Sequence, residues 1–130
     1  QFASSAASDV YKRQILNFGH TVGHAIESFT NYKNLLHGEA IFYGMKCALY
    51  LSNKFGNLSN DEYDISSQLL SKFELPKLDI DNRETFINFV KNDKKFREKK
   101  IRFILLDEIG KSRISKDITF DQIKESLSVL

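Results

Sequence analysis

The fold of this chain is decided by the stretch NFGHTVGHAIESFTNYKNLLHGEA, residues 17–40, which contains all three histidines. His20 and His24 are four positions apart, so on a helix they project from the same face, one turn apart. A short polar segment precedes His37 and predicts a loop that returns it to the side of His20. The spacing therefore indicates a site built on two adjacent helices.

The chemistry of three clustered histidines is open at this point. A neutral imidazole is a good zinc ligand, and helices that contribute one ligand each are common at metal sites. The same spacing also fits buried or capping histidines, or proton transfer without a metal. Glu27 and Glu39 are near, but their spacing directs neither at the same point. Asn17 fits either a helix N-cap or a hydrogen bond to a polyol hydroxyl.

The distribution of apolar residues predicts a mostly α fold with one small β-hairpin. Apolar residues recur at helical spacing between positions 19 and 30, and Gly19 permits close backbone approach. Residues 37–54 are apolar nearly all round, which is typical of a central buried helix. Capping signals predict three more helices, and two short β-prone runs predict the hairpin. These signals are Ser59–Glu62, Asp81–Glu84, Thr119–Gln122, and the runs 101–106 and 111–115.

The composition is that of a globular domain. The 130 residues are 42% hydrophobic and 28% charged, and a net charge of +2 gives no signal for nucleic-acid binding. No window reaches the ~18 apolar residues of a membrane span, so no membrane partner is expected. Cys47 is the only cysteine, which predicts an inert buried thiol and a reducing cytoplasmic location. Residues 1–14 do not share the later patterning, so we expect an anomalous or non-native segment followed by one domain, residues 15–130.

A basic run covers residues 91–102 and holds seven basic residues against two acidic ones. Such a field favours a phosphorylated or carboxylated ligand, although a solvated loop face has the same composition.

Five motifs in order identify a resemblance that covers nearly the whole patterned chain. RQILNFGHTVGHAIE is followed by LHGEAIFYGM, NDKK, IRFILL and IGK. This series resembles the C-terminal domain of 3-dehydroquinate synthase, within the sugar-phosphate cyclase superfamily. The resemblance implies the helical C-terminal fold of that enzyme.

The resemblance also implies roles for individual residues. His20 and His37 fall on metal-ligand positions, with a third ligand, a glutamate, from a segment upstream of this chain. His24 falls on a proton-transfer position. Arg13 and Asn17 fall on substrate-binding positions. The DKK motif implies a substrate-binding lysine, either Lys94 or Lys95.

The implied reaction converts 3-deoxy-D-arabino-heptulosonate 7-phosphate to 3-dehydroquinate and phosphate in the shikimate pathway. It implies a divalent metal, zinc with cobalt as an alternative, and NAD held mainly by an N-terminal domain. The chain has no glycine-rich unit of the required kind, so we expect the 130 residues alone to be inactive. The resemblance further implies that the full-length enzyme is a homodimer.

Other functions remain open. A sister cyclase of secondary metabolism would share the metal histidines and differ around the substrate carboxylate. A non-enzymatic helical domain would use bound zinc only to stabilise its fold. Alcohol dehydrogenases of related architecture are more distant, since the NFGHT and DKK motifs are not theirs.

Overall fold

The computed structural model describes residues 12–94, 96 and 102–130. Within them the chain forms α2 (His20–Phe29), α3 (His37–Lys54), α4 (Asn60–Ser71) and α5 (Arg83–Asn92). The hairpin strands β1 (Phe103–Glu108) and β2 (Lys111–Ser115) follow, and then α7 (Phe120–Ser126) and the 3-10 turn η1 (Leu127–Val129). This is the mostly helical fold with one small hairpin that the sequence predicts.

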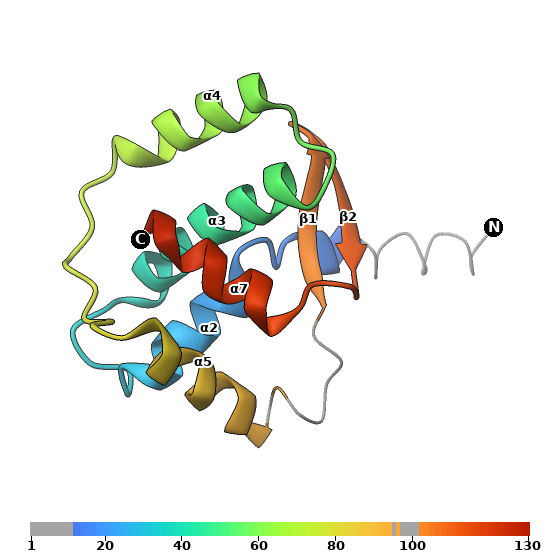
Figure 1. Cartoon of the computed structure of the whole chain (residues 1–130). Helices are drawn as coiled ribbons and strands as arrows, with labels where there is room; N and C mark the ends of the chain where they lie inside the picture. The colour runs from blue at the N-terminus through green and yellow to red at the C-terminus, as the bar shows by residue number, and fades with distance from the viewer. Residues whose placement is uncertain (1–11, 95, 97–101) are drawn as a thin grey trace.

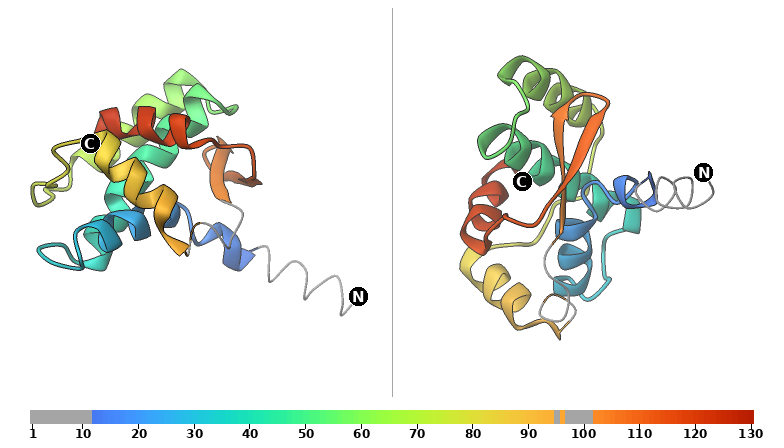
Figure 2. Two further views of the ribbon diagram at one scale, coloured as in Figure 1. Left: turned by 60° about the horizontal axis from the view of Figure 1, so that its bottom comes forward. Right: turned by 90° about the vertical axis from the view of Figure 1, so that its right-hand side faces the viewer.

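Helix α3 lies in the middle of the molecule, as its apolar sequence predicts. It packs against α2, α4, β1 and α7, with α4 above it in the view of Figure 1. Helix α5 packs against α2 and α7, and both views of Figure 2 show α5 beside α7. The buried positions of α3 run from Ala40 to Ser52, so this one helix supplies the centre of the core.

The hairpin strands are antiparallel, with Phe103 opposite Ser115 and Leu105 opposite Arg113. Gly110 closes the turn with φ of +89°, a left-handed conformation that glycine adopts without strain. The register is irregular between Leu106 and Glu108.

Two of the four candidate helix caps in the sequence differ from the caps in the structure. Asn82, and not Asp81, caps α5, and its Oδ1 accepts hydrogen bonds from the N–H groups of Glu84 and Thr85. Aspartate and asparagine cap helices equally well, so residue type alone does not distinguish the two positions. Likewise, the N-cap of α2 is Gly19 in a left-handed conformation, not Asn17.

The other two capping signals are confirmed. Thr119 and Gln122 form a reciprocal box at the start of α7. Ser59 caps α4 through the N–H of Glu62. The Glu62 carboxylate, however, accepts a hydrogen bond from the Ile109 N–H across the hairpin turn, at 3.2 Å. This side chain therefore joins α4 to the hairpin.

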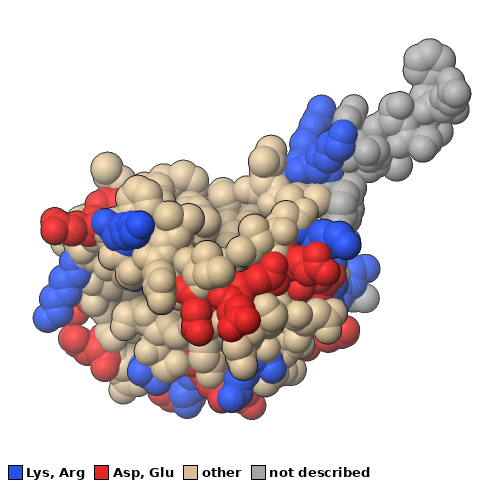
Figure 3. Space-filling model, turned by 90° about the horizontal axis from the view of Figure 1, so that it is seen from above, with Lys and Arg blue, Asp and Glu red and all other residues tan. Residues whose placement is uncertain are grey.

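Helix α4 presents much of its surface to solvent. Acidic side chains gather on the face of the molecule that it covers, with basic side chains nearer the margins (Figure 3). Asp61 and Glu62 lie in its first turn, where the helix dipole favours negative charge. In the described parts of the chain, no helix is long and apolar enough to cross a membrane.

Candidate metal centre

Helix α2 places His20 and His24 on one face, as their spacing predicts. His20 is half-buried, and its Nδ1 lies 3.3 Å from the carbonyl oxygen of Phe18. His24 is exposed. Their ring centroids are 5.2 Å apart in an edge-to-face arrangement.

The loop between the two helices returns the chain within a few residues. Asn31, Tyr32 and Asn34 adopt left-handed backbone conformations, with φ between 57° and 66°. The N–H of Tyr32 donates to the carbonyl oxygen of Glu27 at 2.8 Å, which ties the loop to the end of α2. At its other end the Leu36 N–H donates to the Glu39 carboxylate at 2.7 Å. His37 is therefore held at the first position of α3.

Close backbone contact between α2 and α3 sets the distance between the histidines. A Cβ atom on Gly44 would lie 1.9 Å from the carbonyl oxygen of Gly19, and one on Gly19 would lie 2.7 Å from the Met45 backbone nitrogen. Only glycine fits at these two positions. The predicted close approach at Gly19 is thus confirmed, and its partner is Gly44, the second glycine of the HGEAIFYGM segment.

The three histidines converge on one point. One ring nitrogen from each of His20, His24 and His37 can be chosen so that all three lie within 4.8 Å of one another. The His37 ring centroid is 5.7 Å from that of His20 and 5.8 Å from that of His24. The fold thus brings together the three histidines that the sequence predicts. Because the three distances are nearly equal, they do not distinguish metal ligands from a proton-transfer residue.

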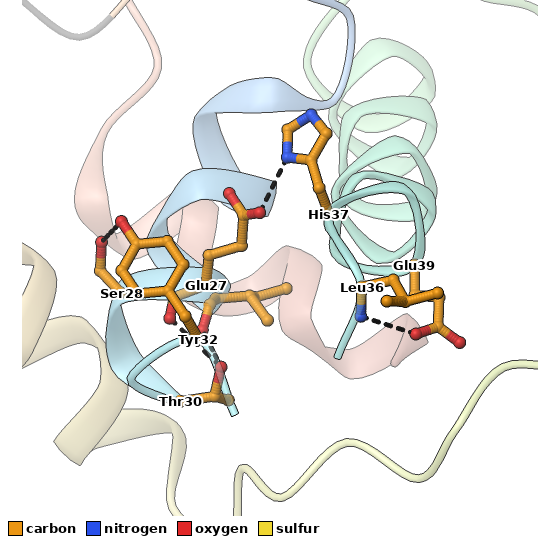
Figure 4. Close-up of polar contacts among 8 residues, drawn as sticks. Glu27, Ser28, Thr30, Tyr32, Leu36, His37 and Glu39 are labelled. Carbon is orange, nitrogen blue, oxygen red and sulfur yellow. Dashed lines mark hydrogen bonds and ion pairs between the residues drawn. The ribbon is translucent and has the colours of Figure 1, made fainter. Parts of the chain in front are cut away.

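The donor set suits a divalent metal. Nitrogens that share a zinc ion at ~2.0–2.1 Å lie about 3.4 Å apart in tetrahedral geometry, so only a small closure of the cluster is required. Figure 4 shows the Glu27 carboxylate reaching His37, and its Oε1 lies 2.8 Å from the ring Nδ1. With Nδ1 engaged, Nε2 is the His37 nitrogen available to an ion.

A cavity of about 300 Å³ opens beside the cluster. Its lining combines two of the histidines with residues of the preceding segment, of α2 and of the hairpin. These residues are Gln14, Asn17, His20, Thr21, His24, Arg102, Ile104 and Ile114. Such a cavity offers a ligand hydrogen-bonding groups next to the metal position.

Comparison with known proteins gives the family. The sequence model described as 3-dehydroquinate synthase C-terminal matches residues 4–96. The chain belongs to this family.

The curated relatives are whole 3-dehydroquinate synthases. The proteins from Campylobacter concisus and Campylobacter fetus subsp. fetus are 42% and 43% identical over 116 residues. Each match covers 88% of this chain and 34% of the relative. The chain thus spans about a third of the length of the 3-dehydroquinate synthases it matches.

Solved structures of two sugar-phosphate cyclases share the fold of this 3-dehydroquinate synthase domain. A 2-deoxy-scyllo-inosose synthase, in complex with carbaglucose-6-phosphate, NAD+ and Co2+, gives a TM-score of 0.68 at 26% identity. That match covers 85% of this chain and 32% of the other. A 2-epi-5-epi-valiolone synthase from Streptomyces hygroscopicus subsp. jinggangensis gives a TM-score of 0.68 at 20% identity, over 95% and 35% of the chains. This second likeness concerns the fold alone.

Of the other predicted site residues of this 3-dehydroquinate synthase domain, Asn17 lines the cavity beside the histidines, whereas Arg13 and Lys94 do not. Arg13 is exposed in the short helical segment before Asn17. Lys94 is exposed just beyond α5 and is not among the residues that line the cavity. Lys95 lies outside the described residues. The substrate-binding roles of Arg13, Asn17 and the lysines stay predictions.

Sequence reasoning missed several residues of the site. Glu27 is seven positions after His20, hence on the same helix face, and this spacing was a signal for it. Thr21 and Arg102 carried no such signal, because they are 81 positions apart. The Thr21 hydroxyl donates to the Arg102 carbonyl oxygen at 2.9 Å, which brings the end of the basic run to the cavity.

Proposed function

We propose that this chain is the metal- and substrate-binding domain of a 3-dehydroquinate synthase. The complete enzyme converts 3-deoxy-D-arabino-heptulosonate 7-phosphate to 3-dehydroquinate and phosphate, with NAD held mainly by an N-terminal domain outside this chain. The observation that carries the proposal is the cluster of His20, His24 and His37, with ligand atoms within 4.8 Å of one another, in a chain of this family.

His20 and His37 are the proposed metal ligands from this chain, completed by a glutamate from the upstream part of the protein. The ion is zinc, with cobalt as an alternative, and the Co2+ and NAD+ in the related 2-deoxy-scyllo-inosose synthase support a divalent metal together with NAD. When bound, the ion polarises a carbonyl of the substrate as a Lewis acid. NAD supplies a transient oxidation of a substrate hydroxyl and ends unchanged.

The other residues act on the substrate directly. His24 is exposed beside His20, and its imidazole accepts or donates a proton at the reacting carbon or oxygen. The Asn17 amide, at the cavity lining, hydrogen-bonds a substrate hydroxyl. Arg13, with Lys94 or Lys95, binds the phosphate or carboxylate, because such anions require a nearby cation when they lose their hydration.

Substitution of each histidine in the full-length enzyme tests the proposal. We expect His20→Ala and His37→Ala to lose bound metal and turnover together, measured as metal content and phosphate release. The variant His24→Ala should keep its metal and lose about 10²–10⁴ in rate, because only proton transfer is removed. If His24→Ala empties the site while His37→Ala leaves it full, the assignment of ligands is wrong.

A sister cyclase is the second candidate function. The two solved structures described above are a 2-deoxy-scyllo-inosose synthase and a 2-epi-5-epi-valiolone synthase. The first of them holds a carbocyclic analogue of a hexose 6-phosphate. Assay of the full-length enzyme with 3-deoxy-D-arabino-heptulosonate 7-phosphate and, separately, with a hexose 6-phosphate decides between them. Turnover of only the hexose 6-phosphate would replace the proposed reaction.

The complete enzyme is further proposed to be a cytoplasmic homodimer. The buried free thiol of Cys47 supports a reducing compartment. The dimer rests on the family resemblance, and light scattering of the full-length protein gives its mass directly.

A further inference from the structure

We propose that Glu27 is a positioning residue that fixes the tautomer and orientation of His37 in the metal centre. The inference rests on the proposed function only in taking His37 as a metal ligand. It assigns a role to a side chain that neither binds the ion nor touches the substrate.

The contact is direct. Glu27 Oε1 lies 2.8 Å from His37 Nδ1, and the other ring nitrogen points away from the carboxylate (Figure 4). The Glu27 side chain is 10% exposed and the His37 side chain 59% exposed. The carboxylate is therefore the fixed partner, held in the packed face of α2, and the imidazole is the partner it orients.

The chemistry of the pair follows from its donors and acceptors. An ionised carboxylate only accepts hydrogen bonds, so the proton must reside on His37 Nδ1 in the neutral ring. Nε2 then carries the lone pair that a metal requires. A carboxylate behind a ligating imidazole also raises the basicity of that ligand, and its loss typically lowers metal affinity about 10–100-fold.

A purely structural link between α2 and α3 would use the same contact but would not control the tautomer of the ring. Two variants separate these roles. Glu27→Met removes the acceptor at similar volume, whereas Glu27→Gln can still hydrogen-bond Nδ1 but, as both donor and acceptor, no longer selects one tautomer. Glu39→Gln is the matched control, because Glu39 contacts the Leu36 N–H and lies two positions from His37.

The first measurement is the tautomer of the neutral His37 ring in the metal-free full-length protein, read from its imidazole nitrogen chemical shifts. We expect protonation at Nδ1 in the unsubstituted protein and in Glu39→Gln, and a mixture of tautomers in Glu27→Met and Glu27→Gln. Circular dichroism checks that each variant is folded. Protonation at Nε2 in the unsubstituted protein would overturn the proposal even if no variant folded.

The second measurement is zinc affinity by competition with a chelator. We expect a loss of about 10–100-fold for Glu27→Met, a smaller loss for Glu27→Gln and no change for Glu39→Gln. Equal affinity in all four proteins would refute the positioning role. Neither readout depends on turnover, so an enzyme with the expected tautomer and affinity but another substrate would refute the proposed function and leave this inference standing.

Discussion

Ser52 joins two elements through one hydroxyl group. It is fully buried in α3, its Oγ donates to the Ala48 carbonyl oxygen at 2.7 Å, and the same oxygen accepts from the Leu106 N–H of β1 at 2.9 Å. A backbone N–H that loses its acceptor away from bulk water costs free energy. This hydroxyl therefore links the central helix to the hairpin.

We expect Ser52→Ala to lower the free energy of unfolding by about 1–3 kcal/mol, because the Leu106 N–H loses its acceptor. Ser66 of α4 is the control, since its hydroxyl donates only within its own helix, to the Glu62 carbonyl oxygen. Ser66→Ala should change stability by no more than about 0.5 kcal/mol. Urea denaturation of the three proteins measures both values, and equal stability of Ser52→Ala and the parent would contradict the link.

Cys47 is fully buried, and burial raises the pKa of its thiol to about 12. We expect the folded protein to resist alkylation at pH 8 and the urea-unfolded protein to react readily, which a thiol reagent measures directly. The raised pKa also fixes the pH dependence. The contribution of the protonated Cys47 thiol to the free energy of unfolding is fully present below the thiol pKa of the unfolded chain, near 9. It is lost as the pH rises toward the pKa of about 12 in the folded protein.

A Cys47→Ala variant supplies the control for this pH dependence. Its unfolding free energy should fall less steeply than that of the parent above about pH 9, because it lacks the buried thiol. Parallel curves for the two proteins would contradict the assignment.

At residue scale, the sequence predicted which side chains meet in the histidine cluster but not which side chains support them. The spacing of His20 and His24 is sufficient, since helical geometry alone puts them together. The Glu27 contact depends on how the return loop directs His37, and loop conformation is not contained in periodicity. A similar limit applies to Asn82, because residue type alone does not distinguish it from Asp81 as the cap of α5.

At the scale of secondary-structure elements, the arrangement of the three histidines depends on how α2 packs against α3. Both helices were predictable because their apolar residues repeat strongly, and α3 begins and ends at the predicted residues. The close approach of the two helices was predictable only in part. Gly19 signalled a close approach, whereas the role of Gly44 requires knowledge of which helix lies opposite.

We expect Gly44→Ala to destabilise the protein by about 1–3 kcal/mol, since a Cβ there would lie 1.9 Å from the Gly19 carbonyl oxygen and must push the helices apart. Zinc affinity should fall with it, because His20 moves relative to His37. Gly38 of the same helix has nothing within 4 Å of an added Cβ. Gly38→Ala should therefore be neutral or stabilising by up to about 1 kcal/mol. Thermal unfolding compares the two, and a stable Gly44→Ala would show that the helices separate freely.

On the scale of the whole molecule, α4 leaves several apolar side chains exposed to solvent. In α4, Ile65 and Leu69 are 61% and 57% exposed, and Leu70 is the buried residue. Phe73, just beyond the end of the helix, is 52% exposed. Periodicity identifies an apolar face but does not say what it packs against. That limit matters here, because the chain spans about a third of the length of the relatives it matches.

We expect the 130-residue chain alone to bind zinc more weakly than the full-length enzyme and to release no phosphate from the substrate. The proposed upstream glutamate and NAD are both absent from it, so the ion has fewer protein ligands. Chelator competition on the two proteins measures the difference. Equal affinity would show that the three histidines hold the ion by themselves.

The short loop between α2 and α3 also bears on the order of folding. Glu27 and all three histidines lie between positions 20 and 37, so the centre assembles from neighbours in sequence. Closing so short a segment costs little chain entropy, and contacts of low sequence separation form early. The helical pair should be present in the folding transition state, with φ-values above those of the hairpin, whose docking onto α3 joins residues more than fifty positions apart. The nascent chain would thus bring its three histidines together before its domain is complete.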